Sequence, residues 1–304
     1  MMRACHTLLK LFSIVLVFMA CEEETPPPDP SPPVEQGIRK GAGDFIYRGY
    51  QPLANKPLKV WYYAPEDEMA DLEIVCVMHG AARNGRDYRD SWISLANQYK
   101  FLLLAPEFSE AAYPDGRSYN LGNIFDRNDQ QNPEETWAFH IIDALIDEVQ
   151  SQISSKQDSF FIYGHSAGAQ FVHRYHLFHP NNKAKKSIAA NAGWYTMPEL
   201  DRAFPYGLEG TPTSLADVRS AFSKSLSILL GTADNDPNAT NLRQTAEAKA
   251  QGPHRFARGN YFFQQSESEA MNLNTVFNWE LKTVEGVGHS NAQMAPAAAA
   301  LFFE

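Results

Sequence analysis

The most reactive feature of the sequence is a serine within a turn of small residues. The pentapeptide Gly164-His165-Ser166-Ala167-Gly168 follows a β-prone apolar run, Ser159 to Tyr163, and precedes a helix-prone segment, Ala169 to Phe178. A strand, a G-x-S-x-G turn and a helix present a serine hydroxyl at the edge of a sheet. The next amide, on Ala167, then points toward a developing oxyanion. We therefore predict Ser166 as a nucleophile. The alternative for the pentapeptide alone is an ordinary strand-to-helix turn.

A serine hydroxyl needs a base to take its proton and a carboxylate to orient that base. Both residue types follow predicted strands later in the chain. The run Ser225 to Leu230 leads into a turn with Asp234 and Asp236, and the alternating run Phe277 to Val284 leads to His289. We favour Asp234 as the acid because it comes first out of its strand. Asp236 precedes a proline and is expected to shape the loop, while the alternative for Asp234 is a turn or helix-capping role.

A fourth segment could complete an oxyanion hole. The apolar run Leu72 to Met78 predicts a strand, which ends in His79-Gly80-Ala81-Ala82. Small residues at this point can donate the second oxyanion amide, and the sequence leaves Ala81 and Ala82 both open as its source. His79 is expected to hold the loop rather than to react.

These motifs resemble those of α/β-hydrolase-fold serine esterases, in which serine, acid and histidine follow in this chain order. The matching pieces are Val77 to Gly80, Gly164 to Gly168, Gly231 to Asp234 and Gly286 to Ser290. Within that superfamily the chain is most similar to secreted bacterial hydrolases related to polyhydroxyalkanoate depolymerases and feruloyl esterases. The resemblance spans roughly residue 60 to the C-terminus.

The resemblance implies a serine hydrolase that cleaves carboxylic esters through an acyl-enzyme. Short-chain, aromatic or polyester-like substrates would all fit. A rival on the same fold is a serine peptidase or an acyltransferase, which shares every part named above. A rival of another class is a non-catalytic surface binding protein on a hydrolase scaffold.

The remaining elements predict an α/β fold. Strand-like and helix-like segments alternate, which favours a mostly parallel, doubly wound sheet with helices on both faces. The catalytic domain is expected over residues 44–304 and opens with two antiparallel strands, 45–50 and 58–63. The clearest helix is 133–153, which Pro133 starts and which carries its apolar residues on one face.

Two long loops, at 108–132 and 194–222, are predicted insertions in this domain. Loops of this length in a compact domain are usually functional. Their rings could line an apolar substrate cleft, although the alternative is that they only pack the loops. The rings that we single out are Tyr119, Phe125, Trp194 and Tyr195.

The N-terminal segment is predicted to direct export. Its apolar run, Leu11 to Ala20, is too short to span a bilayer and resembles a bacterial lipoprotein signal over residues 1–20. In such signals the following cysteine, here Cys21, carries the lipid. Residues 21–43 are an acidic and proline-rich tether. These features predict a membrane-anchored lipoprotein, with the cell surface as one location. The alternative is simple cleavage of a signal peptide with Cys21 incidental.

Composition limits the partners. The 304 residues carry a formal net charge of −10, which becomes −12 once residues 1–20 and their two basic side chains are removed. Such a charge argues against nucleic acid and other anionic polymers, and it favours neutral substrates. The membrane is then contacted only through the lipid anchor. The sequence carries no signal for the oligomeric state.

No cofactor or metal is predicted. The chain lacks the glycine-rich and Cys-x-x-Cys patterns that hold nucleotides and metals. His173, His176 and His179 recur at every third position, but they lack an acidic or cysteine partner nearby. We therefore expect these histidines on a helix surface. Cys76 is expected to be a buried small hydrophobe within a strand.

Overall fold

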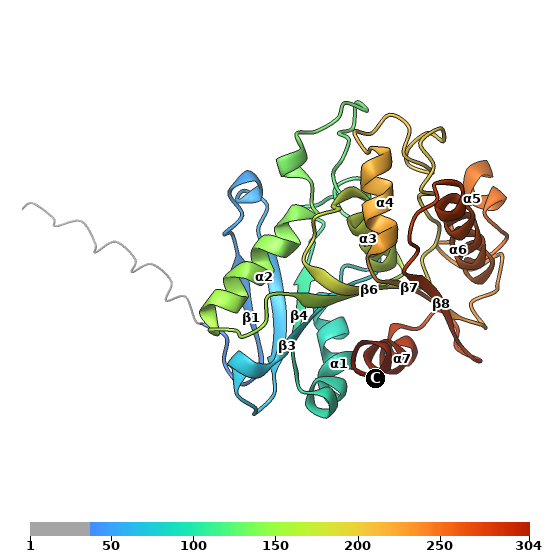
Figure 1. Cartoon of the computed structure of the whole chain (residues 1–304). Helices are drawn as coiled ribbons and strands as arrows, with labels where there is room; N and C mark the ends of the chain where they lie inside the picture. The colour runs from blue at the N-terminus through green and yellow to red at the C-terminus, as the bar shows by residue number, and fades with distance from the viewer. Residues whose placement is uncertain (1–36) are drawn as a thin grey trace, which may run out of the picture. The chain divides into compact units, whose positions relative to one another are not determined.

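Strand order defines the architecture of the computed structural model, which describes residues 37–304. One eight-stranded sheet runs in the order β1-β2-β4-β3-β5-β6-β7-β8 (Figure 1). β2 pairs antiparallel with β1 and with β4, and the remaining neighbours pair in parallel. The strands are β1 (Gly41–Tyr47), β2 (Leu58–Ala64), β3 (Glu73–Met78), β4 (Phe101–Glu107), β5 (Phe160–His165), β6 (Ala184–Ala190), β7 (Leu226–Gly231) and β8 (Trp279–Val284).

Helices cover both faces of this sheet, as predicted (Figure 1). α1 and α7 share one apolar core with one face of the sheet, whereas α2, α3, α4 and α6 contribute to the core on the other face. The helices are α1 (Gly85–Tyr99), α2 (His140–Gln152), α3 (Ala167–Phe178), α4 (Leu215–Ser223), α5 (Ala246–Ala250), α6 (Arg255–Asn272) and α7 (Asn291–Phe303).

The central strands are apolar on both faces because helices cover both. Every residue of β5 and of β7 is buried, so these strands read as continuous apolar runs. β2, the second strand from the edge of the sheet, alternates between buried and half-buried positions instead. The two cores therefore fix the carboxyl ends of β3, β5 and β7 at the same edge of the sheet.

Three predicted boundaries are wrong. β1 already begins at Gly41, within the expected tether. α2 begins only at His140, because the preceding residues Glu134–Thr136 form a short 3₁₀ turn after Pro133. The expected loop 194–222 ends early, because Ser214 and Asp217 form a reciprocal capping box that starts α4.

The histidines of α3 do not lie on a surface. His173 and His176 are fully buried, because the sheet and the loops after β4 and β6 enclose the helix. His173 donates to the carbonyl of Ala169 and accepts from the amide of Thr196, and His179 contacts Asp143 at 2.9 Å. The described residues hold no cluster of three potential metal ligands. No helix within residues 37–304 is long and apolar enough to cross a membrane.

Candidate active site

The turn at Ser166 is a strained strand-to-helix junction. Ser166 has φ 59° and ψ −115°, a conformation that L-residues seldom adopt, and its amide donates to the carbonyl of Ala190. A Cβ on Gly164 would lie 2.2 Å from the carbonyl oxygen of Gly168, and one on Gly168 would lie 2.1 Å from that of Met78. Only glycine fits at either position, because backbone atoms approach each other so closely at this turn.

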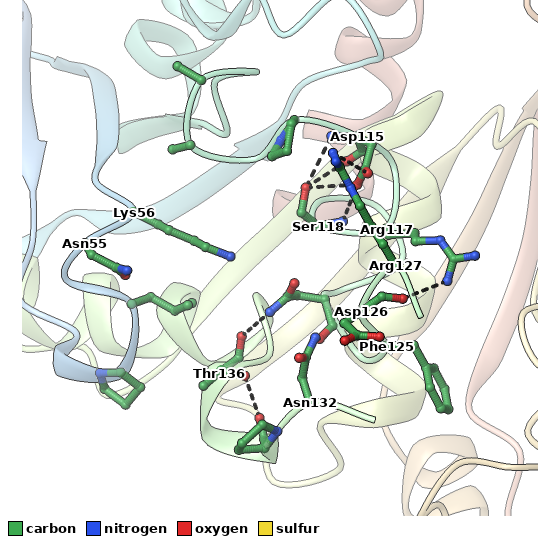
Figure 2. A pocket seen from close by; sticks show the side chains of 17 residues that line it. Asn55, Lys56, Asp115, Arg117, Ser118, Phe125, Asp126, Arg127, Asn132 and Thr136 are labelled. Carbon is green, nitrogen blue, oxygen red and sulfur yellow. Dashed lines mark hydrogen bonds and ion pairs between the residues drawn. The ribbon is translucent and has the colours of Figure 1, made fainter. Parts of the chain in front are cut away.

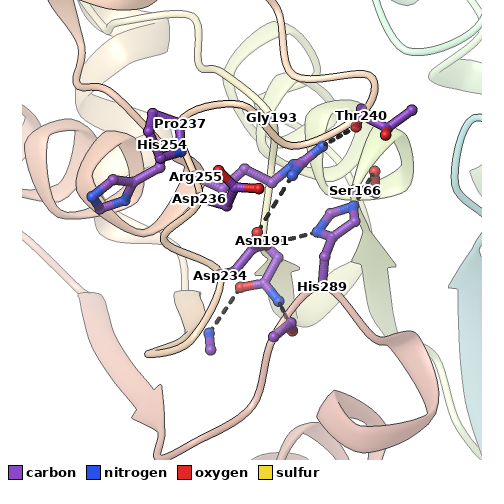
Figure 3. A network of polar contacts seen from close by, with 12 residues as sticks. Ser166, Asn191, Gly193, Asp234, Asp236, Pro237, Thr240, His254, Arg255 and His289 are labelled. Carbon is purple, nitrogen blue, oxygen red and sulfur yellow. Dashed lines mark hydrogen bonds and ion pairs between the residues drawn. The ribbon is translucent and has the colours of Figure 1, made fainter.

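The structure brings Ser166, His289 and Asp234 into one hydrogen-bonded chain (Figure 3). The hydroxyl of Ser166 lies 2.9 Å from Nε2 of His289, and Nδ1 of His289 lies 2.7 Å from Oδ2 of Asp234. With Nδ1 donating to the carboxylate, Nε2 is free to accept the serine proton. Asp234 is buried and His289 remains partly exposed. The competing carboxylate, Asp236, is exposed and accepts a bond from the amide of Asn238.

Close backbone contacts hold the loop of Asp234 against the loop of His289. The amide of Ala233 donates to the carbonyl of Val287. Asn191, at the end of β6, accepts from the amide of Gly231 and donates to the carbonyl of Gly288. One side chain therefore bridges the acid strand and the histidine loop, a role that the sequence analysis missed.

His79 holds the loop after β3, as expected. Its Nδ1 donates to the carbonyl of Gly80, and its Nε2 accepts from the amide of Phe108. Burial lowers the pKa of His79 to about 4, which keeps the ring neutral and both bonds intact. The hydroxyl of Tyr119 also donates to the backbone carbonyl of His79. The loop is thus fixed on two sides next to Ser166.

A cleft of about 490 Å³ opens beside the serine. Its lining includes Ala81 and Ala167, but not Ala82. Within the described residues, no backbone acceptor is bonded to the amide of Ala81 or of Ala167. A Cβ on Gly80 would lie 3.6 Å from that of Ser166, so this loop borders the serine directly.

Arg243 is the arginine of the cleft lining that has no carboxylate partner in the described part of the chain. Arg117 and Asp115 also line the cleft, but Arg117 pairs with Asp129 and Asp115 pairs with Arg127. The ring of Trp194, also in the lining, lies between the guanidinium of Arg243, 4.6 Å from the ring centroid, and that of Arg174, at 4.3 Å. Arg174 is fully buried, and its Nη2 has no hydrogen-bond partner among the described residues. Within residues 37–304, neither Arg174 nor Arg243 forms an ion pair with a carboxylate.

The other aromatic residues that the sequence analysis proposes for the substrate cleft do not line it. Tyr119 and Tyr195 are fully buried, so the prediction that they line the substrate cleft is wrong. Tyr195 stacks on Phe262 of α6 with centroids 4.5 Å apart. Phe125 lines a second hollow of about 660 Å³, which shares Asp115 and Arg117 with the cleft (Figure 2).

His165 packs directly against His289, with ring centroids 4.5 Å apart. Its Nδ1 lies 3.2 Å from the hydroxyl of Tyr88. Burial, followed by the charges of His289 and Arg255, holds the pKa of His165 well below its usual range. A neutral ring therefore supports His289 from the side of β5.

Comparison with solved structures gives two close relatives. Poly(aspartic acid) hydrolase-1 from Sphingomonas sp. KT-1 is 43% identical, with 88% of this chain and 100% of that chain covered and a TM-score of 0.85. LpqC, a poly(3-hydroxybutyrate) depolymerase from Bordetella parapertussis, is 32% identical, with 87% and 90% covered and a TM-score of 0.83. A fluorophosphonate-binding serine hydrolase from Staphylococcus aureus, 17% identical at a TM-score of 0.53 with 86% and 97% covered, shares the fold. No protein-family model and no curated protein matches the chain.

The mostly parallel sheet, with a serine at the strained turn after its central strand, defines the α/β-hydrolase class. The chain belongs to this family, and it is similar to the bacterial polymer hydrolases and depolymerases within it. It is therefore a hydrolase, and the predicted fold is confirmed.

Proposed function

We propose that the protein is a serine hydrolase that cleaves carboxylic esters through an acyl-enzyme. The observation that carries this proposal is the continuous chain Ser166–His289–Asp234, with contacts of 2.9 and 2.7 Å. Ser166 attacks the carbonyl carbon while His289 takes its proton at Nε2. Asp234 holds the imidazole in the Nδ1–H tautomer and stabilises the imidazolium that forms.

The oxyanion would be held by two backbone amides. Ala167 supplies one, at the start of α3. For the second we propose Ala81 rather than Ala82, because only Ala81 lines the cleft with Ala167. Preorganised amides stabilise the tetrahedral intermediate, and removing one such donor costs on the order of 10² to 10³ in rate.

Collapse of that intermediate releases the alcohol, to which His289 returns the proton. Water then enters the open cleft, gives a proton to His289 and attacks the acyl carbon, which frees the acid and Ser166. An acyltransferase would use an alcohol in place of this water. The partly exposed side chain of His289 supports hydrolysis, because solvent water reaches the base.

Labelling with a fluorophosphonate tests the proposal, together with hydrolysis of 4-nitrophenyl esters. We expect the label on Ser166, and we expect Ser166→Ala to lose both label and activity by about 10⁴-fold or more. Thermal unfolding of the variant serves as the folding control. A folded chain with neither labelling nor hydrolysis would instead support the non-catalytic binding protein.

A second candidate substrate is a chain that carries carboxylates. The specific observation in its favour is a pair of arginines at the cleft without carboxylate partners among residues 37–304. Arg243 lines the cleft, and the buried Arg174 contacts the ring of Trp194. One close relative is named for poly(aspartic acid), a polyamide with a carboxylate on every residue. Local charge at the cleft, rather than the net charge of the chain, decides which substrate binds there.

Parallel assays of poly(aspartic acid) and poly(3-hydroxybutyrate) separate the two candidates. If the anionic chain is the substrate, Arg243→Gln raises its KM at least about tenfold and leaves KM for a neutral ester unchanged. Added salt should raise the same KM, because it screens the arginines. Turnover of the polyester alone would favour the ester hydrolase.

We also propose that the protein is exported and anchored through Cys21. The apolar run before Cys21 and the tether after it support this proposal. Cys21, residues 1–20 and most of the tether lie outside the described residues.

A further inference from the structure

Arg255, the first residue of α6, carries the nearest positive charge to Asp234. Nη1 of Arg255 lies 3.4 Å from Oδ1 of Asp234, and the two side chains are each 4% exposed. Nη2 donates to the carbonyl of Thr240 (Figure 3). Among the described residues, Asp234 is the only carboxylate in ion-pair contact with Arg255. In this buried pair, each side chain therefore depends on the other for its opposite charge.

The two oxygens of Asp234 have different partners. Oδ2 accepts from Nδ1 of His289, whereas Oδ1 faces Arg255 (Figure 3). The amide of Phe256, in the first turn of α6, also donates to the backbone carbonyl of Asp234. A buried carboxylate is costly to keep ionised without a cation, and a free one can rotate about its χ2 bond. Arg255 supplies that cation, and its contact with Oδ1 fixes the orientation of the carboxylate so that Oδ2 faces Nδ1 of His289.

We propose that Arg255 is a positioning residue for the Ser166–His289–Asp234 chain. Its buried positive charge balances the carboxylate of Asp234 and holds that carboxylate oriented toward Nδ1 of His289. The inference rests on the proposed serine-hydrolase function. Arg255 is 3% exposed and does not line the cleft, so it acts through Asp234 and not on substrate.

The pH dependence of activity reports on this arrangement. The titratable and charged groups around His289 and Asp234 come from four elements. They are His165 on β5, Tyr195 after β6, Asp236 in the acid loop, and Arg255 and Arg258 on α6. Among these surrounding groups, Arg255 alone forms an ion pair with Asp234. The other contact of the Asp234 carboxylate is with His289.

The experiment measures kcat, KM and the pH profile of kcat/KM with 4-nitrophenyl butyrate. We expect Arg255→Gln to lower kcat at least about 30-fold with KM within about twofold. The acid limb of its profile should move to higher pH, because loss of a nearby positive charge favours the protonated imidazole. We expect Arg255→Lys, which keeps the charge, to retain kcat within about tenfold and the wild-type acid limb.

Arg258→Gln is the matched control. Arg258 is also buried on α6, and it donates to the carbonyls of Gly252, Gly193 and Arg243, not to Asp234. Its loss should lower the melting temperature without moving the acid limb. If Arg255→Gln likewise lowers the melting temperature and leaves the acid limb unmoved, Arg255 is merely structural and the inference is wrong.

Three further outcomes are decisive. If Arg255→Gln does not fold, Arg255→Lys decides, because a folded lysine variant with more than a 100-fold loss of kcat would show that the charge is not what matters. A wild-type protein that neither hydrolyses the ester nor reacts with fluorophosphonate would overturn the proposed function itself. An active wild type with an unmoved acid limb in Arg255→Gln overturns only the role of Arg255.

Discussion

Gly231 and Val287 lie so close together that a Cβ on Gly231 would be 2.3 Å from the carbonyl oxygen of Val287. This contact joins the strand before Asp234 to the loop that carries His289. A glycine is therefore required at position 231 because of close approach of two backbones, and its φ is not in the left-handed region. The separation of acid and base depends on this contact.

We accordingly expect Gly231→Ala to push the histidine loop away from Asp234. A displacement of about 1 Å at a reacting group can lower turnover about 100-fold. The strain should also destabilise the fold by about 1–3 kcal/mol. Ester hydrolysis and urea unfolding measure the two effects. Gly37→Ala is the control, since nothing lies within 4 Å of a Cβ there. Equal activity of both variants would refute the argument.

Asp234→Asn should lower kcat at least about 100-fold, because an amide cannot select the Nδ1–H tautomer of His289 or stabilise its cation. Asp236→Asn should change kcat less than about threefold, since its side chain is exposed and bonds only within its own loop in the structure. Steady-state kinetics of both variants decide between the carboxylates. The reverse order of damage would show that Asp236 is the acid.

Trp194→Ala should raise KM for aromatic esters more than for acetate esters. The ring lines the cleft beside Ala167, and a good aromatic contact contributes about 0.5–1.5 kcal/mol. The rise in KM for aromatic esters should therefore exceed the rise for acetate esters by a factor of about 2 to 13. Trp194→Phe, which keeps a ring, is the control. An equal rise for both esters would mean that Trp194 only packs between Arg174 and Arg243.

Stability should rise between pH 4 and pH 6.5. Burial lowers the pKa of His176 to about 4, so in this window the unfolded state binds more protons than the folded state. The free energy of unfolding then increases with pH, by up to about 3 kcal/mol from this one group. Urea unfolding across the window measures the slope. His176→Gln keeps a donor for the carbonyl of Ala221 and should flatten that slope. An unchanged slope would contradict the prediction.

Cys21→Ser should release the protein from membranes or leave it unprocessed. Lipid attaches only through the thiol, and two or three acyl chains anchor a protein far more firmly than one. Membrane fractionation and mass spectrometry of the mature N-terminus test this. Cys76→Ser is the control, because Cys76 is buried within β3. An unmodified N-terminus beyond Cys21 would exclude the lipid anchor and leave export open.

Some features were readable from the sequence because local signals carry them. Small residues around Ser166 encode a strained turn, and apolar runs that end in Asp234 and His289 encode two strand ends at the same edge of the sheet. The capping box at Ser214 and Asp217 is an equally local signal, and it begins α4 inside the predicted loop 194–222.

The fold class and the order of the reactive residues follow from local sequence patterns, because strand-end turns depend on neighbouring residues. Which aromatic side chains reach the cleft depends instead on how distant segments pack. Tyr119 and Tyr195 are buried and Trp194 lines the cleft, although all three come from loops of similar composition. The tertiary structure also places Arg255 on Asp234, since that contact depends on how α6 packs against the sheet. Burial and charge pairing are set by distant segments, and no local pattern encodes them.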